Sequence, residues 1–324
     1  MRQTVYFLLA AIFSMPFSAF AIFDDCKHFF PDQHTPISIE VGQDLCFDEF
    51  AIYYSPTHKK PIYTVEKLNG PKLENPRPPR TNQFYEEARL PKAARSSLSD
   101  YRGSGFDRGH NVPAGDMTTE SGMAQSFSLA NMMPQARQNN QGIWAKNVEE
   151  PTRQYAKRIQ GNLFVYTGST GTKGAIGKNQ VTVPADLFKL VYDPQEKRAW
   201  AYWVQNTDDA VMSPPISYQE LEKRTGIQFH LPISADQPRL GAWYPVFFEQ
   251  YSEQKVKEII ANIQAGRIAG IEIHYDTNIE LAKKLLNTIE AQSSLKVKMM
   301  QERPPESSGI TYKRDQVSVI VRTR

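Results

Sequence analysis

Composition alone gives little indication of what this chain does. Its 324 residues carry a formal net charge of only +3, so bulk electrostatics does not indicate a nucleic-acid-binding protein. Beyond a short apolar run near the N-terminus, the sequence lacks a segment that could span a bilayer. The length allows one large hydrophobic core, or a main domain with a small appendage.

The apolar run has the layout of a targeting signal. Arg2 precedes it, the run extends from Val5 to Phe13, and small and turn residues follow up to Ala21. This order is typical of a cleavable signal peptide over residues 1–21, and the run is too short to span a bilayer comfortably. We therefore expect an exported protein, periplasmic or secreted, without stable membrane insertion. An uncleaved N-terminal anchor is the alternative.

Cysteine is scarce, since only Cys26 and Cys46 are present. Both follow the expected cleavage point, and an exported protein meets an oxidising environment. We expect one disulfide, which closes a loop of about 20 residues and contributes on the order of 3 kcal/mol of stability. Neither cysteine is close in sequence to the candidate site described below, so the bond should be structural.

Hydrophobic periodicity predicts a mixture of strands and helices without regular alternation, which favours an α+β fold over a doubly wound sheet. Strands are expected in a hairpin over residues 47–67, at 126–134, at 162–171 and as a pair within 180–206. Helices are expected at 140–159, with a kink at Pro151, and at 217–226, where Gly226 ends the helix. Residues 69–84 are rich in proline and predict an irregular loop.

The pattern changes beyond about Leu240. Helices are expected at 252–266 and 278–293, and strands at 268–276, 295–300 and 315–323, with the linker "RPPESSG" before the last strand. We therefore divide the chain into a signal peptide (1–21), a main domain (22–240) and a C-terminal α/β appendage (241–324) of unknown role.

Chemistry is most strongly indicated by the segment "YRGSGFDRGHNVPAGDM". It contains His110, charges of both signs, and two bends permitted by Gly103 and Gly105. A histidine can be a core residue, a metal ligand or a base. Arg108 lies on the same face of an extended strand as His110, where its guanidinium could hold an oxyanion.

An amide-rich segment follows about thirty residues later, at the expected start of a helix. Asn139 and Asn140 lie there among several glutamines, and such amides can cap a helix or bind a metal. Together with His110, they suit phosphodiester hydrolysis. A neutral imidazole can take a proton from water, and a hard divalent cation on an amide oxygen can neutralise charge on the phosphate. A largely hydrated shell suits Mg²⁺, with Mn²⁺ as a second possibility.

These motifs resemble a known family. "DYRGSGFDRGH" followed by "NMMPQARQNNQGIW" is similar to the DNA/RNA non-specific endonucleases, and a weaker similarity extends from about Cys46 to His230. The resemblance implies a ββα-metal nuclease core with mixed or antiparallel sheets, and an enzyme that cuts DNA and RNA substrates with little sequence preference. It does not cover the appendage, and the sequence leaves the oligomeric state open.

The resemblance also implies roles for particular residues. His110 matches the general base, Asn140 the metal-ligand asparagine, and Arg108 the arginine that faces the phosphate. Arg80, in "RTNQF", resembles an upstream phosphate-binding arginine, with Arg77 as a competitor. We expect Asp107 to fix the turn and Asn139 to cap the helix.

One position departs from the family pattern. The family places a glutamate four residues after the helix tryptophan, and this position is Val148 here, with Glu149 one residue later. On a regular helix Glu149 would point about 180° away from Asn140, whereas Asn147 would share its face. A bulge near Pro151 could restore the glutamate. Glu149 is therefore expected to act on the metal through water, with Asn147 as the alternative.

Two other functions are compatible with the sequence. A catalytically decayed nucleic-acid-binding protein, serving uptake or scavenging, is suggested by the displaced glutamate. A serine hydrolase could use Ser104, although "RGSGF" lacks the Gly-x-Ser-x-Gly spacing.

Overall fold

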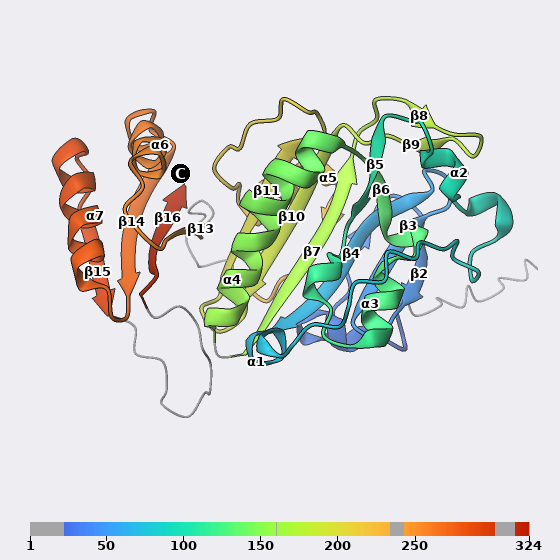
Figure 1. Cartoon of the computed structure of the whole chain (residues 1–324), viewed down its shortest axis with the longest axis horizontal. Helices are drawn as coiled ribbons and strands as arrows, with labels where there is room; N and C mark the ends of the chain where they lie inside the picture. The colour runs from blue at the N-terminus through green and yellow to red at the C-terminus, as the bar shows by residue number, and fades with distance from the viewer. Residues whose placement is uncertain (1–22, 160, 234–242, 302–314, 324) are drawn as a thin grey trace, which may run out of the picture.

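A computed structural model describes residues 23–159, 161–233, 243–301 and 315–323 (Figure 1). The expected signal peptide and the linker "RPPESSG" lie outside the described residues. Within the described residues, the structure contains no helix that is both long and apolar enough to cross a membrane. Cys26 and Cys46 are joined by a disulfide, which confirms the expected bond.

The main part is built on a six-stranded antiparallel sheet with the order β11-β10-β7-β4-β3-β2. Its strands are β2 Gln43–Cys46, β3 Phe50–Ser55, β4 Lys60–Asn69, β7 Asn162–Thr170, β10 Asp186–Asp193 and β11 Arg198–Gln205. The hairpin, the central strand and the strand pair expected from the sequence are all present. The strands are rich in aromatic and β-branched residues, which fit a pleated surface that is covered on both faces.

Helices cover one face of this sheet (Figure 1). A π-helix, η6 Asn139–Glu149, continues directly into α4 Glu150–Arg158. The opposite face is covered by the N-terminal segment around Phe23 and Phe30 and by α5 Tyr218–Thr225, after which Gly226 takes the left-handed conformation that ends the helix. The predicted helix ending at Gly226 is thus confirmed.

A strand pair precedes the π-helix and completes a ββα unit. β5 Phe106–His110 pairs antiparallel with β6 Met132–Ala136. Between them lie η4 Ala114–Asp116, α3 Glu120–Ser126 and η5 Leu129–Asn131. The strand predicted from Ser126 was therefore wrong in its first half, because the Ser128 side chain accepts from the amide of Ala130 and starts a 3-10 turn.

The proline-rich loop before this unit contains one short helix that was not predicted. α1 Gly70–Glu74 begins where the Asn69 side chain accepts a hydrogen bond from the amide of Lys72, and Pro71 occupies its first turn. The remainder of the loop is irregular, as expected. The smaller elements are η1 Lys27–Phe29, η2 Pro31–Gln33, β1 Ile37–Ser38, η3 Lys92–Ala94, α2 Leu98–Tyr101, β8 Ala175–Ile176, β9 Val181–Thr182 and β12 Ile227–Gln228.

The C-terminal segment forms a four-stranded sheet with the order β13-β16-β14-β15 and two helices. Its elements are β13 Trp243–Phe248, α6 Glu253–Gln264, β14 Ile268–Tyr275, α7 Ile279–Gln292, β15 Val297–Gln301 and β16 Val317–Thr323. β14 and β15 are parallel, and the other neighbours are antiparallel. β13 lies against α4 and β11, and the apolar residues of both parts form one continuous cluster.

Candidate active site

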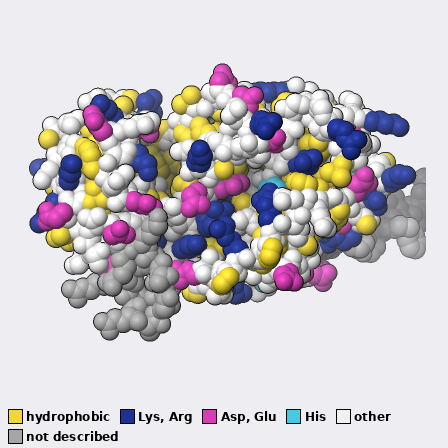
Figure 2. All heavy atoms as spheres, in the orientation of Figure 1, with side chains coloured by type: hydrophobic (Ala, Val, Ile, Leu, Met, Phe, Trp, Pro, Cys, Tyr) yellow, Lys and Arg dark blue, Asp and Glu magenta, His cyan; other side chains and the backbone are white. Residues whose placement is uncertain are grey.

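A cavity of about 510 Å³ opens where β5, the proline-rich loop and the π-helix meet. On this face of the molecule, a histidine side chain and several basic side chains gather near the middle, with acidic side chains beside them (Figure 2). The cavity is lined mainly by charged and amide residues: Arg80, Asn82, Phe84, Phe106, Asp107, Arg108, His110, Pro113, Ala114, Gly115, Asn140, Gln141, Ala145, Glu149 and Arg153.

The five residues singled out from the sequence all line this cavity. β5 supplies Arg108 and His110, the proline-rich loop supplies Arg80, and the π-helix supplies Asn140 and Glu149. The two alternatives lie elsewhere. The side chain of Arg77 donates to the carbonyl oxygen of Gly115 (3.2 Å) without lining the cavity, and Asn147 is exposed outside it.

The π-helix explains how Glu149 shares the cavity with Asn140. Nine residues of a regular α-helix make about two and a half turns, so these two side chains would face opposite directions. The i→i+5 hydrogen bonding of a π-helix puts more residues into each turn, and nine residues then make about two turns. A helix distortion before Pro151 therefore compensates for the extra residue.

The DRGH strand and its neighbour approach closely because position 109 is glycine. A Cβ atom there would overlap the side-chain amide of Gln135, which lies on β6. Gln135 in turn donates to Oδ1 of Asn139 (2.9 Å), and Nδ2 of Asn139 donates to the carbonyl oxygen of Gln205 (2.7 Å). The expectation that Asn139 caps the helix was wrong, because this buried side chain instead ties the helix start to β6 and β11.

Asp107 orients the amide of Asn140. Nδ2 of Asn140 donates to Asp107 Oδ2 (3.0 Å), and Nε2 of Gln141 donates to the same oxygen (2.8 Å). Because the donor end of the Asn140 amide is held by the carboxylate, its oxygen is directed away from Asp107 and is left free to bind a cation. We expected Asp107 to fix the turn, but its side chain accepts hydrogen bonds from the helix start, so the segment that it fixes is a different one.

His110 is partly exposed and packs between two phenylalanine rings, Phe84 at 5.8 Å and Phe127 at 5.1 Å between centroids. Burial, followed by the charges of Arg80 and Arg108, lowers the pKa of His110 from 6.5 to about 3, so the imidazole is neutral near pH 7. Its Nε2 is buried and has no hydrogen-bond partner among the described residues. An unsatisfied buried nitrogen costs stability, and such groups concentrate at functional sites.

Glu149 lies among other charged groups on the helix-covered face of the sheet. Burial raises the pKa of Glu149, and the nearby charges of Lys189 and Arg153 oppose the rise. Arg153 forms close ion pairs with Asp116 and with Glu150 (2.9 Å). A carboxylate that is costly to ionise favours a cation beside it.

Arg153 also lines the cavity, although the sequence indicated only its regular spacing from Glu149 and no role in the site. Glu149 ends η6 and Arg153 lies in α4, and their spacing of four residues on this continuous helix places both on one face. Ser104, the candidate nucleophile of a hydrolase, does not line the cavity. Its hydroxyl donates to the carbonyl oxygen of Tyr101 (2.8 Å), and it stabilises the turn between Gly103 and Gly105, both of which have positive φ.

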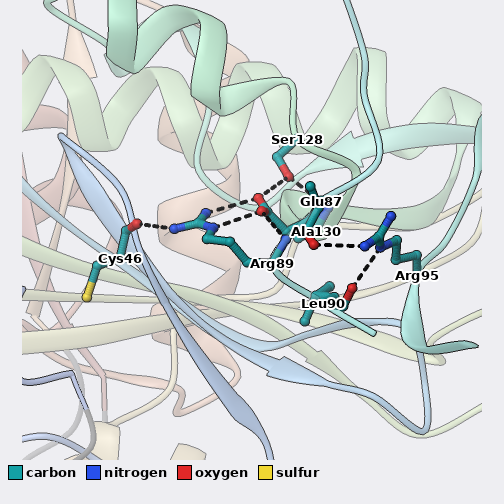
Figure 3. A network of polar contacts seen from close by, with 8 residues as sticks. Cys46, Glu87, Arg89, Leu90, Arg95, Ser128 and Ala130 are labelled. Carbon is teal, nitrogen blue, oxygen red and sulfur yellow. Dashed lines mark hydrogen bonds and ion pairs between the residues drawn. The ribbon is translucent and has the colours of Figure 1, made fainter. Parts of the chain in front are cut away.

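A polar network fixes the chain that follows Arg80 and Phe84 (Figure 3). Arg89 bridges β2 and this segment, because it donates to the carbonyl oxygen of Cys46 (2.6 Å) and makes two hydrogen bonds to the carboxylate of Glu87 (2.8 and 3.0 Å). Glu87 also accepts from the hydroxyl of Ser128 (3.2 Å), which precedes β6. Arg95 donates to two carbonyl oxygens of the same segment, those of Ala88 and Leu90.

The residues present fit a hard divalent cation. Asn140 offers an amide oxygen, and Glu149 offers carboxylate oxygens on the same cavity. In the described ranges, the structure contains no group of three or more histidine, cysteine, aspartate or glutamate residues placed to enclose a metal. With one amide and one carboxylate as its protein groups, an ion held here would keep much of its hydration shell, as Mg²⁺ does in proteins.

Comparison with known proteins gives consistent matches. The model of the DNA/RNA non-specific endonuclease family matches residues 33–236. The mitochondrial nuclease EXOG of Xenopus laevis is 29% identical over 209 residues, which cover 57% of this chain and 58% of the relative. Nuclease C1 of Cunninghamella echinulata var. echinulata is 34% identical over 168 residues (46% and 66%), and human mitochondrial endonuclease G is 32% identical over 157 residues (44% and 52%). The chain thus spans less than two thirds of the length of each relative.

A chain from the crystal structure of the EndoG/EndoGI complex has a similar fold. The TM-score is 0.52 at 24% sequence identity, and the match covers 57% of this chain and 84% of that chain. This similarity agrees with the α+β architecture expected from the sequence. The family match ends at residue 236, before the first strand of the C-terminal sheet.

Proposed function

This chain belongs to the DNA/RNA non-specific endonuclease family, and on this ground we propose that it is an exported endonuclease that hydrolyses phosphodiester bonds in DNA and RNA. The observation that carries the proposal is that one cavity collects a neutral histidine, two exposed arginines and an amide oxygen beside a half-buried carboxylate. These are the groups needed to deprotonate water, hold a phosphate and bind a hard cation.

In the proposed reaction, His110 acts as the general base. Its neutral imidazole takes a proton from a water molecule, the water oxygen forms a bond to phosphorus, and the bond from phosphorus to the 3′-oxygen breaks. The departing 3′-oxygen takes a proton from solvent water, and the imidazolium returns its proton to solvent. Burial, and after it the charges of Arg80 and Arg108, lowers the pKa of His110 in the free protein. A bound phosphodiester places negative charge beside both guanidinium groups, and this charge offsets them and favours proton uptake by the imidazole.

In the proposed reaction the arginines bind the phosphate, and the amide and carboxylate groups position the metal ion. The guanidinium groups hold the non-bridging oxygens of the phosphate, and Asp107 keeps the oxygen of Asn140 directed into the cavity. A divalent ion, which we propose to be Mg²⁺ with Mn²⁺ as a substitute, would be held by Asn140 directly and by Glu149 through water, and would neutralise charge on the phosphate and the leaving oxygen.

Weak sequence preference follows from what the cavity offers. Its charged side chains are suited to phosphate oxygens, which are common to every nucleotide, whereas sequence is read from base edges. Export is supported by the signal-like residues 1–21 and by the disulfide, because such bonds persist in oxidising compartments such as the periplasm or the medium.

Cleavage of supercoiled plasmid and of single-stranded RNA, each with Mg²⁺ or with EDTA, tests the proposal. We expect both substrates to be cut only with the metal, and His110→Ala to lower the rate by two to three orders of magnitude, roughly the scale of a lost general base. A wild-type protein that binds DNA but cuts neither substrate with Mg²⁺ or Mn²⁺ would instead be the catalytically decayed binding protein.

A further inference from the structure

Two phenylalanine rings support the basic side chains of the cavity. The guanidinium carbon of Arg108 lies 4.3 Å from the centroid of the Phe84 ring, and that of Arg80 lies 5.0 Å from the centroid of Phe127. The ring of His110 meets Phe127 edge to face. The two phenylalanine rings also meet edge to face, with centroids 5.0 Å apart. One aromatic pair, Phe84 and Phe127, therefore contacts all three basic groups.

This support leaves the charge of the arginines available. Within the part of the chain that the structure describes, neither Arg80 nor Arg108 forms an ion pair with a carboxylate, and Arg80 donates only to the neutral side chain of Asn82 (2.8 Å). A carboxylate would neutralise a guanidinium and occupy its N–H donors. A ring face attracts the cation through its quadrupole and occupies none of them. Arg153 shows the contrasting arrangement, since Asp116 pairs with it.

The backbone holds the two rings in a fixed relation, although 43 residues separate them in sequence. The amide of Tyr85, next to Phe84, donates to the carbonyl oxygen of Phe127 (3.4 Å), and the amide of Leu129 donates to the carbonyl oxygen of Tyr85 (2.8 Å). Phe127 is fully buried in the core, and Phe84 is half-buried at the cavity wall. The ring faces are thus fixed before any ligand arrives.

We propose that Phe84 and Phe127 are positioning residues, whose rings hold the two arginines and the histidine of the cavity in the arrangement that binds a phosphodiester. The inference rests on the proposed function, because it assigns the nucleic-acid backbone as the ligand of the arginines. It adds that the electron density of the two rings, and not only their shape, determines the affinity of the cavity for the nucleic-acid backbone.

The test changes the electronics of each ring while keeping its shape. 3,4,5-Trifluorophenylalanine introduced at position 84 or 127 withdraws electron density from the ring face. The Kd for a short fluorescein-labelled single-stranded DNA, measured by anisotropy in EDTA, should rise by about two- to fivefold for each fluorinated ring, as expected for a cation–π contact at an exposed site. The value of kcat/KM with Mg²⁺ should fall by at least the same factor.

Phe47 provides a matched control outside the cavity. The guanidinium carbon of Arg89 lies 4.3 Å from its ring centroid, and this arginine is neutralised by Glu87. Fluorination of Phe47 should leave both DNA affinity and cleavage unchanged. Phe84→Leu should weaken DNA binding, and Phe84→Tyr should restore it, because tyrosine keeps an electron-rich ring face.

The outcomes separate this inference from the proposed function. If fluorination at positions 84 and 127 leaves the DNA affinity unchanged, or if Phe47 has an equal effect, the inference is overturned while the nuclease assignment stands. If the wild type cuts no substrate but its DNA affinity falls with fluorination at 84 and 127 only, the assignment fails and the positioning role is supported.

Discussion

Alanine substitutions at two adjacent asparagines should affect different properties. Asn139→Ala should lower the stability of the protein, and Asn140→Ala should weaken its response to magnesium. Asn139 is buried, and its amide makes hydrogen bonds to Gln135 (2.9 Å) and to the carbonyl oxygen of Gln205 (2.7 Å). Asn139→Ala removes both bonds and leaves a buried glutamine amide unsatisfied, so we expect the free energy of unfolding to fall by about 2 to 3 kcal/mol. The fully folded fraction should keep a normal response to magnesium, because Asn139 does not line the cavity.

Asn140→Ala should change the stability little and the magnesium response strongly. Its amide nitrogen donates to Asp107, which keeps Gln141 as a second donor, so Asn140→Ala should lower the free energy of unfolding by less than about 1 kcal/mol. The substitution removes the amide oxygen that we propose as the ligand of the ion. We expect the magnesium concentration for half-maximal cleavage to rise at least about tenfold, with partial rescue at high metal concentration.

The assay measures plasmid cleavage against magnesium concentration, per mole of folded protein, together with urea unfolding in EDTA. Gln141→Ala is the control, because it removes the other donor to Asp107 and leaves the oxygen of Asn140 in place. Equal magnesium curves for Asn139→Ala and Asn140→Ala would refute the assignment of the ion to Asn140. A larger loss of stability in Asn140→Ala than in Asn139→Ala would refute the account of the helix start.

Three further predictions follow from burial, the disulfide and the helix geometry. The pKa of His110 is about 3 in the folded protein and 6.5 in the unfolded protein. Between these values the unfolded state binds a proton at His110 and the folded state does not, so the folded state loses stability as the pH falls. We measure the free energy of unfolding in EDTA as the pH is lowered from 6.5 to 3. The wild-type value should fall more steeply than that of His110→Asn, by up to about 1.4 kcal/mol per pH unit. Parallel pH dependences of the two proteins would contradict this prediction. Replacing Cys26 and Cys46 by serine should lower the free energy of unfolding by about 3 kcal/mol and leave cleavage per folded molecule within a small factor of wild type, and a complete loss of cleavage in folded protein would count against a purely structural bond. Glu149→Gln should weaken the magnesium response, whereas Asn147→Ala should not, and the opposite ranking would show that the π-helix does not persist in solution.

The sequence predicted those parts of the fold that depend on local pattern. The strands of the central sheet alternate or concentrate apolar residues over short runs, and the helix before Gly226 carries its own stop signal. Arg108 and His110 are two residues apart on one short strand, so their shared direction follows from the period of two. The single disulfide could be predicted because the chain has only two cysteines and the protein is expected in an oxidising compartment.

Features that depend on distant partners could not be predicted in this way. Asn139 resembled a cap because it stands at a helix start, but its partners lie on β6 and β11, and the latter is 66 residues away in sequence. The strand expected from Ser126 begins late because the hydroxyl of Ser128 competes for a backbone amide. In both cases a polar side chain had two possible hydrogen-bonding partners, and contacts elsewhere in the fold determine which one it uses.

The extra residue in the π-helix shows why the family pattern and a regular helical wheel placed Glu149 on different faces. A regular helix would have moved the carboxylate of Glu149 to the far face, and then Asn147 would have faced the cavity. Val148 and Trp144 are both fully buried, so the core contacts fix the helix on its apolar side and the added residue has to be absorbed within the turn. A π-helix absorbs it at the cost of weaker backbone hydrogen bonding. The distortion lies at the cavity itself, and this location agrees with the frequent use of π-helical turns at functional sites.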